Sequence, residues 1–250
     1  MTPSEQREAP AGRGGLRCYE LAAWRERYGL VAGVTTRDAD FGLASTVPTA
    51  EVVDRWLGFR ARLAPAFHAV VVARQCHGTD IATHDGLPPG WHVLDATDGH
   101  LASHAGVLLT ITVADCVPVY LAQPAGRWLG LLHAGWRGVA QGMVERGISR
   151  LAERAHCTAH DIVIHCGVSI CGECYEVGPE VITAVTGRSV AGPTRLDLRA
   201  EIAHRAAAVG VGRVSVSPWC TAHDAAAFHS HRRSRGTDGR MVAYLGLPSA

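Results

Sequence analysis

Two nearly uninterrupted apolar runs dominate the middle of the chain, at Val107 to Leu121 and at Trp128 to Leu132. Their β-branched residues, and the glycines and prolines around them, favour buried strands over a helix. Each run carries one side chain that can bind a metal: Cys116 lies inside the first, and His133 follows the second. Because neighbouring strands can bring such residues together, the pattern predicts a functional site at the centre of the fold.

Shorter patterned segments lie on both sides of these runs. Short apolar runs that end in polar turns predict further strands at residues 19–34, 67–73, 161–166 and 213–217. Apolar residues at helical spacing predict helices after Pro48, after Gly138, from Pro179 and after Asp197. Segments 85–99 and 219–240 are interpreted as loops. Strands that alternate with helices predict an α/β (α+β) fold, with central mixed β-sheets flanked by helices in one domain over residues 16–250.

Composition is that of an ordinary globular protein. Among 250 residues, 47% are apolar and 19% are charged, and the net charge of +1 argues against a basic face for nucleic acid. Residues 1–15 are polar, lack the apolar centre of a signal peptide and are expected to form a flexible tail. No unbroken apolar run reaches the roughly 18 residues of a membrane helix. We therefore expect a cytoplasmic protein, and a monomer, although the sequence leaves the oligomeric state open.

Eight cysteines and fourteen histidines provide candidate ligands. Without a secretion signal, the cysteines favour thiols or metal ligands over disulfides. His77, Cys116 and His133 each lie at or near the end of a predicted strand, and two histidines with one cysteine form a known catalytic zinc set. Their spacing is too long for a zinc finger. Taken alone, Cys116 also fits the role of a small buried apolar residue, and each histidine fits the role of a hydrogen-bonding residue at a strand end.

Several motifs follow one another in an order typical of a known family, between about Thr35 and Leu247. They are Gln75-Cys76-His77-Gly78, Ala114-Asp115-Cys116-Val117-Pro118-Val119, His133-Ala134-Gly135-Trp136-Arg137-Gly138, Cys174-Tyr175-Glu176-Val177-Gly178 and the tail Phe228 to Met241. Together they resemble the laccase-domain family. Its members were first called multicopper polyphenol oxidases and are now described as purine nucleoside phosphorylases with adenosine deaminase activity.

The resemblance implies the chemistry of the site. His77, Cys116 and His133 match the family's metal ligands and would be the catalytic residues, with Zn²⁺, or Cu²⁺ in its place, as the cofactor. The implied reaction cleaves adenosine, inosine and methylthioadenosine with phosphate to free base and ribose 1-phosphate, with zinc-assisted deamination of adenosine. The expected partners are a small purine nucleoside and phosphate, without nucleic acid or a membrane.

Arginines near the motifs are candidates for binding the phosphate. One guanidinium group can bind two phosphate oxygens at once. The candidates are Arg37, Arg137, Arg232 and Arg233. Each of them equally fits a solvated side chain or a partner of a local carboxylate. Their number therefore predicts a phosphate site without deciding which arginines form it.

The chain departs from the family pattern in two places. The segment Asp38 to Thr46 is shorter than the loop that helps to form the pocket mouth in relatives, which leaves substrate preference open. Cys171-Gly172-Glu173-Cys174 replaces a more compact Pro-Cys-Cys, and His223 stands where a second cysteine often follows. Cys171-x-x-Cys174 has no matching second cysteine pair, so we interpret both as structural thiols, with a redox pair or half of a zinc site as alternatives.

Other function classes stay open. Cys116 with His133 could form the thiolate and base of a cysteine hydrolase or amidase, which would fit a peptidoglycan-precursor editing role attached to the family. His229-Ser230-His231 resembles the His-x-His element of copper-dependent polyphenol oxidases, but those enzymes need several such elements and more domains than this chain can hold. A third class is a metal-binding protein without catalytic activity, but such a protein would have no phosphate for the candidate arginines to bind.

Overall fold

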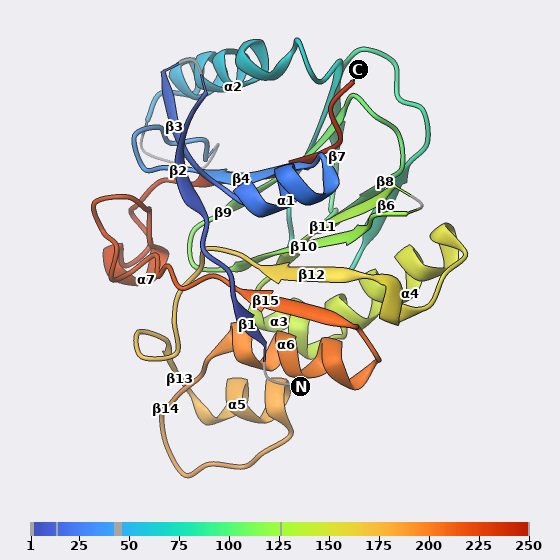
Figure 1. Ribbon diagram of the computed structural model, residues 1–250. Coiled ribbons are helices and arrows are strands. Elements are labelled where there is room, and N and C mark those ends of the chain that lie inside the picture. Colours follow the sequence, from blue (N-terminus) through green and yellow to red (C-terminus); the bar gives the residue numbers. More distant parts are fainter. Residues whose placement is uncertain (1–2, 14, 43–46, 126, 250) are drawn as a thin grey trace.

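Two mixed β-sheets lie face to face at the centre of the molecule (Figure 1). The computed structural model describes residues 3–13, 15–42, 47–125 and 127–249. In spatial order, the first sheet contains β1 (Ser4–Glu5), β15 (Arg213–Val216), β12 (Val163–Cys166), β10 (Val117–Gln123), β11 (Trp128–Ala134), β8 (Gly99–Ala102) and β6 (Ile81–His84). The second contains β2 (Ala9–Arg13), β3 (Leu16–Glu20), β4 (Val31–Thr35), β16 (Met241–Gly246), β9 (Val107–Val113), β5 (Ala69–Ala73) and β7 (Gly90–Leu94).

Helices cover the outer face of each sheet (Figure 1). On the second sheet, α2 (Thr49–Leu63) buries Trp56 and Phe59 against the strands. The first sheet is covered by α3 (Trp136–Ala140), α4 (Met143–Ala155), α5 (Pro179–Thr186) and α6 (Leu198–Ala208). The smaller elements are α1 (Ala22–Tyr28), η1 (Ala159–Asp161), α7 (His231–Ser234) and a hairpin of β13 (Glu176–Val177) and β14 (Thr194–Arg195). This arrangement confirms the predicted mixed α/β fold.

The core between the two sheets takes side chains from both. Leu109 and Ala243 come from the second sheet, Tyr120 and Leu131 come from the first, and all four are buried. The Tyr120 hydroxyl donates to the carbonyl oxygen of Gly33 across the interface, at 2.8 Å. Since apolar layers cover both faces of each sheet, the central strands read as continuous apolar runs and not as alternating ones.

The longer of the two central apolar runs is two strands, which corrects the prediction of one. β9 ends at Val113 in the second sheet, and β10 begins at Val117 in the first. The link Ala114-Asp115-Cys116 therefore crosses from one sheet to the other. Asp115 has a positive φ of 84°, a backbone conformation that residues other than glycine rarely adopt. Periodicity alone could not reveal this turn, because the residues on both sides of it are buried.

Two other sequence expectations differ from the structure near the start of the chain. The predicted strand over residues 19–34 is a strand, a helix and a strand: the end of β3, then α1, then β4. The expected flexible tail contributes β1 and β2, which pair with β15 and β3. Glu8 between them is buried and accepts hydrogen bonds from His165 and Ser217. The shortened loop at 38–46 falls partly outside the described residues, at 43–46.

Later segments show smaller differences. The predicted loop at 85–99 contains β7, which pairs with β5. The helix expected after Gly138 is two helices, α3 and α4, separated at Gly142 with its φ of 84°. The predicted loop at 219–240 contains α7. These breaks are short, and nothing in the local apolar spacing marks them.

The helix starts were predicted correctly where capping chemistry was present. α2 follows Pro48, and Pro179 occupies the first turn of α5. The Asp197 carboxylate accepts the backbone N–H groups of Arg199 and Ala200, which caps α6. Among the described residues, no helix is both long and apolar enough to span a bilayer.

Candidate metal centre and cavity

Three of the predicted ligands converge where the two sheets meet. His77 lies in the loop after β5 of the second sheet, Cys116 in the link between the sheets, and His133 near the end of β11 in the first. One ligand atom from each lies within 4.8 Å of the others, and the two imidazole centroids are 4.9 Å apart. We call these three residues the cavity cluster. The fold thus brings together residues that are far apart in sequence, as the motifs predict.

The loop that carries His77 is fixed by two side chains. Gln75 donates to the carbonyl oxygen of Thr112 in β9 and accepts the Thr112 N–H, at 2.9 and 2.7 Å. The backbone N–H groups of Cys76, His77 and Gly78 all donate to the carboxylate of Asp98, at 2.9–3.0 Å. His77 has a positive φ of 61°, which this set of hydrogen bonds holds in place.

Asp98 also orients the second histidine. Its carboxylate is fully buried and accepts a hydrogen bond from Nδ1 of His133, at 2.8 Å. Burial raises the pKa of Asp98, but the His133 and backbone donors outweigh burial and lower the pKa below its usual value. Nδ1 of His133 therefore carries the hydrogen, which leaves Nε2 free as a ligand atom. The sequence analysis missed Asp98, because it lies at the end of a segment interpreted as a surface loop.

The same contacts make Cys116 and His133 a charged pair when no metal is bound. Burial raises the pKa of Cys116, but the imidazoles of His133 and His77 outweigh burial and lower it to about 6. Burial lowers the pKa of His133, but the Cys116 thiolate and the Asp98 carboxylate raise it to about 9. Cys116 is therefore a thiolate at neutral pH, the form required both of a metal ligand and of a nucleophile.

The space around the cavity cluster fits a small ion. A Cβ atom added at Gly135 would lie 3.1 Å from both the Cys116 sulfur and a ring carbon of His77, so a larger residue would close the approach. Thiolate and imidazole are the donors that Zn²⁺ prefers, and three protein ligands leave one tetrahedral position for water or substrate. The donor set, its spacing and the carboxylate behind His133 all fit a catalytic zinc site.

A cavity of about 910 Å³ opens onto the cavity cluster. Its polar wall contains Arg137, whose guanidinium lies over the Trp136 ring at 4.4 Å, and Arg232, which lies over the Tyr175 ring at 4.9 Å. Further lining residues include Phe41, Trp56, Arg74, His231 and Arg240. The volume and the mixture of aromatic and cationic side chains suit a flat, polar ligand with an anion beside it.

The other two candidate arginines lie outside the cavity lining. Arg37 donates to the carbonyl oxygen of Ala225 and lies 3.6 Å from the Asp238 carboxylate. Arg233 also contacts Asp238, at 2.9 Å, and donates to the carbonyl oxygen of Thr221. Both arginines thus anchor the C-terminal loops in this structure. Local ion pairing of this kind is not visible in the sequence, since Arg37 lies about 200 residues before the Asp238 that it contacts and Arg233 lies in a motif-rich tail.

The His-x-His element at 229–231 does not form one site. Nδ1 of the buried His229 bonds to the carboxylate of Asp238 at 2.5 Å. His231 is exposed and lines the cavity. Because the two side chains have different surroundings, they do not act as the paired copper ligands of a polyphenol oxidase.

The fold and the Cys/His centre define an α/β protein with a cavity that opens onto a Cys/His cluster at the junction of two sheets. The chain belongs to the family described as multi-copper polyphenol oxidoreductase laccase, whose model matches residues 23–248. A relative in Geobacillus stearothermophilus, "purine nucleoside phosphorylase YlmD", is 32% identical over 94% of each chain. A "purine nucleoside phosphorylase" of Deinococcus radiodurans is 35% identical over 76% of each chain.

Solved structures agree with these sequence relatives. The crystal structure of YlmD from Geobacillus stearothermophilus matches with a TM-score of 0.86 and 30% identity, and covers 96% of this chain and 98% of its own. A Bacillus licheniformis protein, YfiH, matches with a TM-score of 0.84 and 27% identity, over 92% of this chain and 96% of its own. The similarity therefore extends over nearly the whole chain, and the range that the family model matches spans the positions of the cavity cluster.

Proposed function

We propose that the chain is a zinc-dependent purine nucleoside phosphorylase. It cleaves adenosine, inosine and methylthioadenosine with phosphate to the free base and a sugar 1-phosphate, and it also deaminates adenosine. The observation that carries the proposal is the meeting of His77, Cys116 and His133 at a cavity whose wall holds Arg137 and Arg232. The names of the relatives support the same reaction class.

The cavity residues divide the work of phosphorolysis. Arg137 and Arg232 bind phosphate, because guanidinium groups pair with its oxygens and balance its charge. Burial raises the pKa of Tyr175 to about 12, so its hydroxyl stays protonated at neutral pH and can donate to a purine that leaves with negative charge. Zn²⁺ held by the cavity cluster would supply nucleophilic water near neutral pH for attack on C6 of adenine.

The test combines metal analysis with turnover on one sample. Purified protein is assayed with inosine and adenosine, with and without phosphate, while free base, sugar 1-phosphate and ammonia are measured. Base release that requires phosphate supports phosphorolysis, and ammonia from adenosine supports the deaminase step. Base release at the same rate without phosphate would contradict the proposal. Elemental analysis separates zinc from copper.

One observation favours a second candidate function, a cysteine hydrolase or amidase. The lowered pKa of Cys116 and the raised pKa of His133 describe a thiolate beside an imidazolium, which also activates a nucleophile. Under that proposal, the metal-free protein is the active form, and iodoacetamide inactivates it by alkylating Cys116. Amides and peptidoglycan precursors would be the substrates to assay.

The monomeric state and the cytoplasmic location stay predictions. Size-exclusion chromatography with light scattering tests the first, and fractionation of the source cells tests the second.

A further inference from the structure

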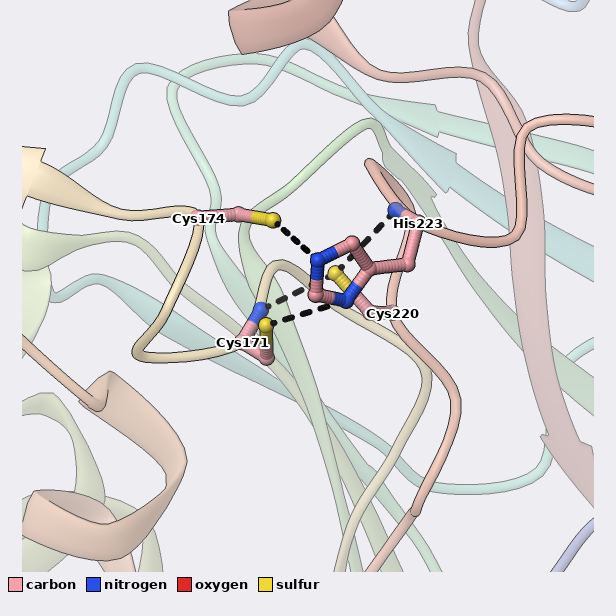
Figure 2. A group of neighbouring side chains, drawn as sticks. All are labelled: Cys171, Cys174, Cys220 and His223. Carbon is pink, nitrogen blue, oxygen red and sulfur yellow. Dashed lines mark hydrogen bonds between the residues drawn. The ribbon is translucent and has the colours of Figure 1, made fainter.

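A second group of metal-binding side chains lies on two loops. Cys171 and Cys174 come from the loop after β12, and Cys220 and His223 come from the segment after β15 (Figure 2). We call these four residues the loop cluster. The cavity lining includes none of them. Cys171-x-x-Cys174, which has no second cysteine pair in the sequence, thus lies beside Cys220-x-x-His223 in the fold.

The loop cluster has the dimensions of a tetrahedral site. All four ligand atoms lie within 4.8 Å of one another. The His223 ring lies between two of the thiols, with its nitrogens 3.7 Å from the Cys171 sulfur and 3.1 Å from the Cys174 sulfur. Zn–S bonds of about 2.3 Å in a tetrahedron place two sulfurs about 3.8 Å apart. A rotation of the exposed His223 side chain would present one nitrogen to an ion among the three sulfurs.

The backbone around Cys220 fixes the position of its sulfur. Its sulfur accepts two N–H groups, from Cys171 at 3.3 Å and from His223 at 3.5 Å (Figure 2). The two loops are already joined, because Ser169 and Cys220 form a parallel β-bridge and the Thr221 N–H donates to Ser169. All eight cysteines are free thiols in this structure, so no disulfide competes for these sulfurs.

We propose that the loop cluster binds a structural Zn²⁺ ion. Three cysteines and one histidine, supplied as two pairs with two-residue spacers, form a closed set that leaves no position for substrate. Thiolate ligands select zinc over magnesium or calcium. The proposal does not depend on the proposed function, because it concerns folding and metal content and not turnover.

The position of the loop cluster gives the ion a role in shaping the cavity. Ile170, next to Cys171, donates its N–H to the carbonyl oxygen of Asp115 at 3.1 Å. Thr221, next to Cys220, donates its hydroxyl to the Asp115 carboxylate at 2.5 Å. Both loops thus hold Asp115, the neighbour of Cys116, in its positive-φ conformation. Zinc in the loop cluster would fasten the two loops that support the cavity cluster.

The test uses the full chain with Cys116→Ala, which removes a ligand from the cavity cluster and leaves the loop cluster intact. After purification with zinc and dialysis against a weak chelator, elemental analysis is expected to find one zinc per chain. Adding Cys174→Ser is expected to remove that zinc. Adding Cys157→Ser instead is the matched control, since this cysteine belongs to neither cluster, and the zinc is expected to stay.

Two outcomes would overturn the proposal. One is a folded Cys116→Ala chain that holds no zinc, and the other is zinc retained after Cys174→Ser. If the double variant does not fold, Co²⁺ loading of the Cys116→Ala chain decides the matter. Strong thiolate-to-cobalt charge-transfer absorption is expected from three sulfur ligands, and its absence would contradict the loop cluster as a site. A strong chelator is also expected to lower the melting temperature of this chain.

Discussion

The cavity cluster and the loop cluster contain the same kinds of side chain but differ in number and surroundings. The cavity cluster has three ligands from three separate parts of the two sheets, and Asp98 fixes both histidine-bearing segments. The loop cluster has four ligands from two neighbouring loops, and backbone N–H groups surround its buried sulfur. Three ligands leave a coordination position open to the cavity, whereas four close the site.

The difference shows how one chain can hold a catalytic metal site and a structural metal site in different parts of the fold. A catalytic metal must sit on rigid elements, because its ligands have to keep an open geometry without the ion's help. A structural metal can join flexible elements, because the bound ion itself supplies the order. In the first cluster His133 lies in β11, and His77 and Cys116 lie in short links that directly follow central strands and are fixed by hydrogen bonds, whereas two longer loops carry the second cluster. The experiments below test whether the two clusters are independent.

The largest effect is expected from Cys116→Ala. This change removes the sulfur ligand of the cavity cluster, so turnover and the zinc bound there are both expected to be lost. His133→Ala is expected to behave alike. Zinc in the loop cluster is expected to remain, which elemental analysis measures alongside phosphorolysis. Full phosphorolysis by Cys116→Ala would refute the role of this cluster in catalysis.

A smaller loss is expected from Asp98→Asn. The amide cannot accept all the N–H groups that the carboxylate accepts, and it weakens the orientation of His133. Loss of such a partner costs about 10–100-fold in metal affinity. Titration with a chelator is expected to show this loss at the cavity cluster and no change at the loop cluster.

Asp224→Asn is the matched control for this experiment. Asp224 accepts the Cys220 N–H at 2.8 Å, and asparagine keeps an oxygen for that single bond. Zinc affinity at the cavity cluster is therefore expected to be unchanged, since this bond is made to a residue of the loop cluster. Unchanged affinity in Asp98→Asn would mean that the carboxylate does not support the metal site.

Much of the fold could be predicted, and the failures have a common physical cause. Apolar runs identified the buried strands, and Pro179 and Asp197 marked helix starts through local chemistry. The break at Asp115 was invisible, because residues on both sides of it are buried in different sheets. The N-terminal strands were missed because Glu8 looks like a surface residue. Its partners His165 and Ser217 lie more than 150 residues away, at separations of 157 and 209.

The site was predictable to the extent that motifs carry it. The cavity cluster could be named from three motifs, but its support by Asp98 could not, since the segment before Asp98 looked like a loop. Of the loop cluster, the sequence analysis singled out Cys171 and Cys174 as a pair but did not connect them with Cys220 and His223. Cys171 and Cys220 are 49 residues apart, and only the fold brings the two pairs together. Contacts between distant loops leave no local periodicity for a sequence to show.

Arg137→Ala tests whether a cavity residue affects substrate binding alone and leaves the metal at both clusters in place. Removing this guanidinium is expected to raise the KM for phosphate about tenfold, with less change in the KM for nucleoside, because a charge-assisted contact to one substrate is lost. Zinc content at both clusters is expected to be unchanged. Arg146→Ala, an exposed arginine on α4, is the control and is expected to leave both KM values as they are. A larger rise in the nucleoside KM would place Arg137 beside the sugar or base.

The smallest effect is expected in the pH dependence of stability of the metal-free protein. The folded pKa of Cys116, about 6, lies below its ordinary value, so this group contributes stability at high pH that is lost as the pH falls through 6. The folded pKa of His133, about 9, lies above its ordinary value, so this group contributes stability at low pH that is lost as the pH rises through 9.

Between about pH 6.5 and 9 these two contributions change in opposite directions, because folding moves a proton from the thiol to the imidazole without changing the number bound. The unfolding free energy from urea titration is therefore expected to be nearly flat across this window in the metal-free chain. Cys116→Ala also removes the thiolate that helps to raise the pKa of His133, so the stability that His133 contributes is then expected to be lost at a lower pH than in the unchanged chain. The alkylation rate of Cys116 is expected to rise through about pH 6 and to be suppressed by zinc. A rate that instead follows an ordinary thiol, rising near pH 8.5, would show that the imidazoles do not hold this sulfur as a thiolate.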